Sequence, residues 1–112
     1  MFKTLAPLVL ATAMSAAAAD LTGTWNCEVE TDMGSGTPTF VLKQTGDSVS
    51  GKYAGALGEA DVTGKVTGSK FEYSFKFDQG SVVYTGEIDG NQTKGSINLA
   101  GQATGKFTCK RK

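Results

Sequence analysis

The chain has 112 residues, eleven basic and eleven acidic side chains, and no histidine. This charge balance gives no electrostatic basis for binding nucleic acid or an anionic membrane surface. The absence of histidine removes the commonest general base and the commonest metal ligand. We therefore expect neither an enzyme nor a metal or other cofactor site.

Residues 1–19 have the composition of an export signal. Lys3 provides a basic start, residues 5–14 are mostly apolar, and Ala17-Ala18-Ala19 forms a small-residue cleavage site. The apolar stretch is too short to span a bilayer. We expect a signal peptide over 1–19, a single domain over 20–112, and a secreted or periplasmic protein without membrane insertion.

Turn residues divide the remaining chain into short alternating segments. Gly46-Asp47, Gly68-Ser69 and Gly90-Asn91 fit two-residue hairpin turns, and Gln79-Gly80 is a fourth turn. The expected strands are 23–31, 37–45, 48–55, 60–67, 70–78, 81–89, 92–99 and 102–111. Two longer loops are expected as well, Asp32 to Gly36 and Ala56 to Glu59.

Alternation within these strands separates the side chains into two faces. All nine aromatic residues after the signal fall on one face, and most lysines and carboxylates fall on the other. An antiparallel sheet around a single core requires such a division. Two-residue turns also fix the register. The predicted partners are Val66 and Ile88 for Phe71, and Val62 and Tyr84 for Phe75.

The two ends of the domain predict closure of the sheet. Cys27 and Cys109 lie in the first and last expected strands, and export favours a disulfide between them. The pairs across this seam are then Cys27–Cys109, Val29–Phe107 and Trp25–Arg111. We predict an all-β fold, an eight-stranded antiparallel up-and-down barrel (a meander) whose seam is closed by one disulfide. An open sandwich of two four-stranded sheets is the alternative.

Five glycines occupy inward positions in the middle of strands. They are Gly51, Gly64, Gly86, Gly95 and Gly105. Such glycines allow the sharp coiling of a small barrel, and aromatic rings often cover them. They could instead leave volume free for a ligand. Both readings fit an eight-stranded barrel, which can fill itself or hold one small molecule.

Two short motifs resemble those of known secreted barrels. Gly23-Thr24-Trp25 resembles the Gly-x-Trp start of calycin barrels, the lipocalin and avidin group, and Ser50-Gly51-Lys52-Tyr53 is similar to the Thr-Gly-x-Tyr segment of avidins. In lipocalins that tryptophan packs against a basic residue of the last strand, a role that the resemblance gives to Arg111. Avidins line their biotin site with several tryptophans, whereas Trp25 is the single one here, so biotin binding is not implied.

The interior composition favours a binding function. No carboxylate or lysine falls on the inward face, which carries three tyrosine hydroxyls that need partners when buried. We therefore predict an exported binding barrel for a small apolar ligand. The predicted ligand-binding residues are Trp25, Tyr53, Tyr73, Phe75 and Tyr84.

A second function class remains open. The barrel could be filled and act as a protein-binding or inhibitor-like scaffold, contacting an extracytoplasmic protein through its two longer loops. Small secreted bacterial inhibitors of metalloproteases are similar in size, export and single disulfide. In either case a closed barrel has no free strand edge, and we expect a monomer.

Overall fold

The computed structural model describes residues 20–77 and 80–112. The predicted signal peptide over 1–19 lies outside the described residues. Regular structure in the described part consists of antiparallel strands. They are β1 (Gly23–Thr31), β2 (Gly34–Gly36), β3 (Thr39–Thr45), β4 (Ser48–Gly55), β5 (Gly58–Thr67), β6 (Lys70–Phe77), β7 (Gly80–Asp89), β8 (Gln92–Leu99) and β9 (Ala103–Arg111). Within the described ranges, no helix is long and apolar enough to cross a membrane.

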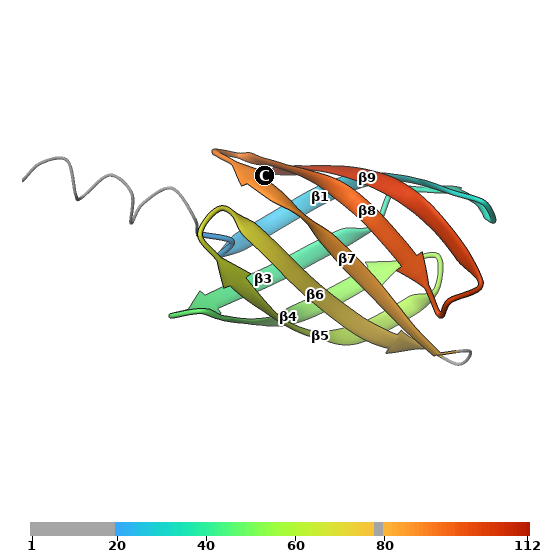
Figure 1. The fold of residues 1–112 in the computed structure, drawn as a ribbon, viewed down its shortest axis with the longest axis horizontal. Helices are drawn as coiled ribbons and strands as arrows, with labels where there is room; N and C mark the ends of the chain where they lie inside the picture. Colours follow the sequence, from blue (N-terminus) through green and yellow to red (C-terminus); the bar gives the residue numbers. More distant parts are fainter. Residues whose placement is uncertain (1–19, 78–79) are drawn as a thin grey trace, which may run out of the picture.

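The sheet closes on itself (Figure 1). From β3 to β9 each strand pairs with the next one in the sequence, and β1 pairs with both β3 and β9. The seam between β1 and β9 contains the pairs Trp25–Arg111, Cys27–Cys109 and Val29–Phe107. Cys27 and Cys109 form the disulfide. The predicted closed barrel and its disulfide are therefore confirmed, and the open sandwich is wrong.

The first expected loop is in fact a hairpin. β2 pairs with the end of β1, and its register, with Val29 opposite Gly36, continues the register of Asn26 opposite Thr39 between β1 and β3. β2 and β3 thus act as one barrel strand interrupted at Pro38, which has no N–H for the ladder. The second expected loop is equally short, because Gly55 pairs with Gly58.

The register between β6 and β7 differs from the prediction. The observed pairs are Phe71–Gly86, Phe75–Val82 and Phe77–Gly80, where the predicted pairs were Phe71–Ile88 and Phe75–Tyr84. The predicted turn at Gln79-Gly80 is therefore wrong, because Gly80 already pairs with Phe77. Moving a turn by one position moves every partner by two residues. Because side chains alternate with a period of two, the inward face is unchanged and only the neighbours differ.

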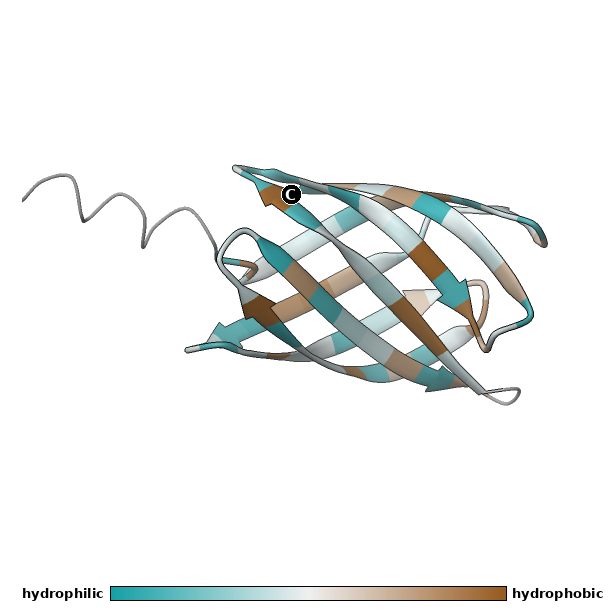
Figure 2. Cartoon of the chain, in the orientation of Figure 1, coloured by the Kyte–Doolittle hydropathy of each residue, from teal (hydrophilic) through white to brown (hydrophobic). Residues whose placement is uncertain are grey.

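The interior is built from the predicted apolar face, and Figure 2 shows hydrophobic and hydrophilic residues alternating along the strands. Eight of the nine aromatic side chains are buried, and Phe77 packs partly buried against them. Phe40 lies at the centre of this cluster, with ring centroids 5.0–5.4 Å from those of Tyr53, Tyr73 and Tyr84. Tilted and edge contacts of this kind stabilise a core beyond simple burial.

The inward glycines are explained by curvature. A Cβ atom built on any of Gly51, Gly64, Gly86, Gly95 and Gly105 would overlap a backbone carbonyl oxygen of the neighbouring strand. Adjacent strands come this close because the small barrel coils sharply. At Gly64 the opposite residue is Tyr73. These glycines therefore permit close approach of the strands, and the interpretation that they vacate ligand volume is wrong.

Candidate ligand-binding cavity

One end of the barrel is closed by the start of the described chain. Leu21 is fully buried there, and its carbonyl accepts a hydrogen bond from Trp25 Nε1 at 2.9 Å. The backbone N–H of Leu21 donates to Gln44 Oε1 at 2.9 Å, and the N–H of Gln44 donates to Thr22 Oγ1 at 3.0 Å. Residues 20–22 therefore cap this end, with their polar groups paired to β1 and β3.

Arg111 seals the same end from the last strand. Its guanidinium donates to the backbone carbonyls of Asp20, at 2.9 Å, and Thr22, and its Nε donates to Asn91 Oδ1 at 3.0 Å. The guanidinium carbon lies 4.4 Å from the centroid of the Trp25 ring. This is the tryptophan–cation contact that the lipocalin resemblance implied, and it stabilises the cap through a cation–π interaction.

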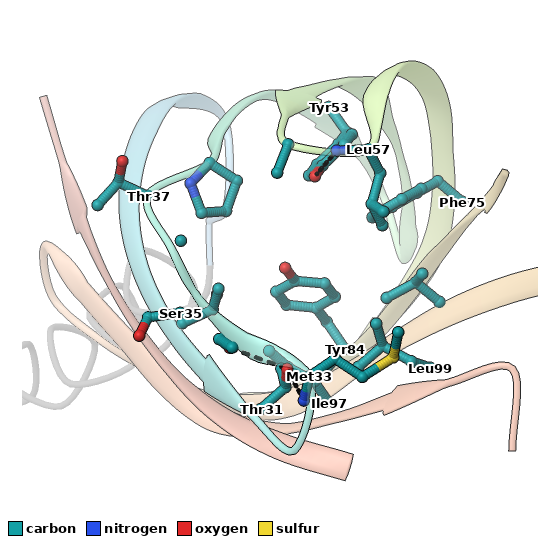
Figure 3. A pocket seen from close by; sticks show the side chains of 16 residues that line it. Thr31, Met33, Ser35, Thr37, Tyr53, Leu57, Phe75, Tyr84, Ile97 and Leu99 are labelled. Carbon is teal, nitrogen blue, oxygen red and sulfur yellow. Dashed lines mark hydrogen bonds between the residues drawn. The ribbon is translucent and has the colours of Figure 1, made fainter. Parts of the chain in front are cut away.

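The opposite end of the barrel contains a cavity of about 200 Å³ (Figure 3). Its floor and walls include inward side chains at the start of β7 and the end of β8, among them Val82, Ile97 and Leu99. Thr31, Ser35 and Thr37 are hydroxyl-bearing residues on the side of β1, β2 and β3. None of the described residues that line this cavity carries a charge. The site is therefore an apolar recess with a few hydroxyl groups.

The mouth of the cavity carries exposed apolar side chains. Met33, in the β1–β2 turn, is 68% exposed and Leu57, in the β4–β5 turn, is 43% exposed, and both line the cavity. Val41, another exposed large apolar residue, lies elsewhere, on the outer wall of β3. Apolar side chains gathered at a cavity mouth are typical of a contact surface. Sequence reasoning missed Met33 and Leu57 as site residues, although an apolar residue at the tip of a turn was the available signal.

The structure separates the five predicted ligand-binding residues into two groups. Tyr53, Phe75 and Tyr84 line the cavity together. Tyr73 lies outside the lining, with its ring stacked on Tyr84 at a centroid distance of 5.4 Å. Trp25 lies at the closed end under Arg111. Three of the five residues therefore line the cavity and two lie outside its lining, and ligand binding by any of them stays a prediction.

Two tyrosine hydroxyls face the cavity. The hydroxyl of Tyr53 accepts a hydrogen bond from the N–H of Leu57 at 3.4 Å. The hydroxyl of Tyr84 points into the open space, and no described residue is its hydrogen-bond partner (Figure 3). Burial raises the pKa of Tyr84 well above its ordinary value, and the neighbouring Tyr53 adds to this effect. Tyr84 therefore presents a neutral hydroxyl, which can donate and accept.

Comparison with known proteins identifies the architecture. No protein-family model and no curated protein sequence matches this chain. A point mutant of the fluorescent protein UnaG is similar in structure, with 17% sequence identity and a TM-score of 0.52, over 82% of this chain and 96% of the other. The domain shares the closed antiparallel barrel fold of that protein. The fatty-acid-binding protein of Manduca sexta has 16% identity and a TM-score of 0.48, over 80% of this chain and 98% of its own. At such low identity the likeness to UnaG concerns the fold alone.

Proposed function

We propose that this calycin-like barrel is an exported binding protein that holds a small apolar molecule in the cavity at its open end. The observation that carries the proposal is the uncharged cavity of about 200 Å³ whose mouth is flanked by exposed Met33 and Leu57. An engineered apolar cavity of about 150 Å³ is large enough to bind benzene. The space here suits a ligand of one or two rings.

Binding would be driven by removal of apolar surface from water. The ligand would contact the walls around Phe75, whose ring stacks on Tyr53 at a centroid distance of 4.0 Å, and would cover part of Met33 and Leu57. Each square ångström of apolar surface buried contributes about 25 cal/mol. A preformed wall needs little rearrangement, which favours affinity. No acid, base or thiol is found among the described lining residues, so the site suits binding and not catalysis.

Export and a monomeric state belong to the same proposal. The apolar and small residues of 1–19 support export, and the Cys27–Cys109 disulfide is of the kind that persists outside the cytoplasm. Pairing of β1 with β9 supports a monomer, because it leaves no long unpaired strand in the barrel wall. Expression of the full chain in a bacterial host should give a secreted or periplasmic protein that begins at Asp20. Measurement of the intact mass identifies the first residue of the purified protein. A protein that retains residues 1–19 would contradict export.

The binding function is tested by filling the cavity with a larger side chain from its wall. Leu99→Trp should place a large side chain in the cavity and lower the affinity for the neutral probe 2-naphthol at least about tenfold, since the ligand loses its volume. Val41→Trp is the matched control, because it adds the same group to the outer wall. Isothermal titration calorimetry gives both affinities. Equal binding by the two variants would show that 2-naphthol does not use this cavity.

The protein-binding alternative receives less support. It depended on two longer loops, and both are two-residue turns between paired strands, 32–33 and 56–57. Short turns offer little adaptable surface for recognition. The exposed large apolar residues of these turns, Met33 and Leu57, both line the cavity.

A further inference from the structure

The cavity lining restricts the charge of its ligand. Its described residues include no lysine, arginine, aspartate or glutamate. A carboxylate or ammonium group that enters such a recess loses its hydration and gains no opposite charge. The free energy of burying an unpaired ion is far larger than that of burying a neutral polar group. The recess therefore selects against ionised ligands.

The cavity also contains a hydroxyl, that of Tyr84, whose donor and acceptor capacity are both free among the described residues. Tyr53 already accepts the N–H of Leu57, whereas the hydroxyl of Tyr84 has no partner among residues 20–77 and 80–112. Tyr84 is 3% exposed, so bulk water reaches it only through the cavity. A buried hydroxyl requires a hydrogen-bond partner, and a ligand that displaced the water without replacing its hydrogen bond would bind less well. A ligand that replaces the water must supply that partner.

From these two features we infer that the ligand is an uncharged molecule of one or two rings with an oxygen substituent, a hydroxyl or a carbonyl, that hydrogen-bonds to the Tyr84 hydroxyl. The inference rests on the proposed function and adds the class of ligand to it. Apolar walls would hold the ring system between Phe75, Val82 and Leu99. The oxygen would lie deep in the recess, and the apolar end would face Met33 and Leu57 at the mouth.

Three probes with the same ring system test this inference: naphthalene, 2-naphthol and 2-naphthoate. Their affinities for the protein with its disulfide intact are measured at neutral pH by calorimetry, with the protein as titrant. We expect 2-naphthoate, which is ionised, to bind at least about tenfold more weakly than 2-naphthol. Comparable binding of 2-naphthoate would overturn the restriction on charge while leaving the binding function intact. Failure of all three probes would overturn the proposed function itself.

The role of Tyr84 is tested by Tyr84→Phe, which removes only the hydroxyl. The affinity for 2-naphthol should fall about tenfold, because the substituent is then buried without a partner, and the affinity for naphthalene should stay within about twofold. Thr85→Val is the control, since it removes a hydroxyl from the outer face of the same strand. Tyr84→Met provides a second variant. An equal effect of the Tyr84 variants on 2-naphthol and naphthalene would overturn the hydrogen bond.

Discussion

Gly64 and Tyr73 show how single residues set the shape of the barrel wall. They lie opposite each other on β5 and β6, and a Cβ atom on Gly64 would be 2.5 Å from the Cα of Tyr73. The strands can approach this closely only because Gly64 has no side chain. The presence of glycine was visible in the sequence. The sequence left two reasons for it open, curvature and ligand volume, because the distance between strands is a property of the folded sheet.

Gly64→Ala should therefore destabilise the protein much more than an ordinary substitution in a strand. The added methyl group meets backbone atoms of β6, which cannot rotate away, so the strands must separate. We expect a loss of about 3 kcal/mol in the free energy of unfolding. Urea denaturation measures it, with the exposed neighbour Thr63→Ala as control. A loss no larger than that of Thr63→Ala would show that the wall tolerates a wider spacing.

Tyr73 and Tyr84 should make the protein sensitive to alkaline pH. Burial raises the pKa of each hydroxyl above its ordinary value of 10.0. The stability they contribute is fully present below about pH 10 and is lost above it, because the unfolded chain releases protons that the folded chain retains. Two such groups lower the free energy of unfolding by up to about 2.7 kcal/mol per pH unit.

Urea denaturation between about pH 8 and pH 11 checks this dependence. The double variant Tyr73→Phe/Tyr84→Phe has no hydroxyls to ionise at these positions, so its stability should fall less steeply over the same range. Lysine ionisation is common to both proteins and cancels in the comparison. Parallel curves for the two proteins would contradict the assignment of the raised pKa values to these rings.

At the scale of the strands and turns, the sequence predicts those features that depend on local backbone conformation, such as the positions of the hairpin turns. The glycines of the three Gly-Asp, Gly-Ser and Gly-Asn turns have φ values of 62–63°, a region that glycine adopts without strain. Each predicted turn and its flanking register is confirmed there. The turn between β6 and β7 was misplaced by one residue because Gly80 begins a strand. A glycine with φ of 137° looks the same in a sequence as one in a turn.

The cap at the closed end depends on Arg111, which joins β9 to residues 20–22 and to the Trp25 ring. Arg111→Ala should lower stability by about 2 kcal/mol, since it removes charge-assisted hydrogen bonds and a cation–π contact together. For a domain of this size that corresponds to about 8–16 °C in Tm. Thermal unfolding followed by Trp25 fluorescence measures the change, and the exposed Lys110→Ala is the control. Equal Tm values for the two variants would show that the cap is held without Arg111.

For the molecule as a whole, closure of the sheet into a barrel could be predicted from the sequence, and the position of the cavity could not. Closure follows from residues that must meet, the cysteines and the Trp25–Arg111 pair at the two ends of the domain. The cavity is what remains after the aromatic cluster around Phe40 has filled the rest of the barrel. That remainder depends on the packing of many side chains at once, and alternation reports only which face each one occupies. Tyr73 and Tyr84 thus both occupy inward positions in the sequence pattern, but only Tyr84 of the two lines the cavity.

Closure also determines how the disulfide stabilises the domain. Cys27 and Cys109 are 82 residues apart, and in the chain-entropy account a cross-link over that length destabilises the unfolded state by about 4–5 kcal/mol. In the folded state, backbone pairing from Trp25–Arg111 to Thr31–Gly105 holds the same seam without the sulfur bridge. Cys27→Ser/Cys109→Ser should therefore keep the fold and the affinity for 2-naphthol, since the disulfide does not line the cavity. Its Tm should fall by at least about 10 °C. Thermal unfolding and calorimetry of the double variant check both expectations. An unchanged Tm would show that the unfolded chain gains no freedom when the link is removed, and loss of binding with the fold intact would show that the cavity depends on the seam.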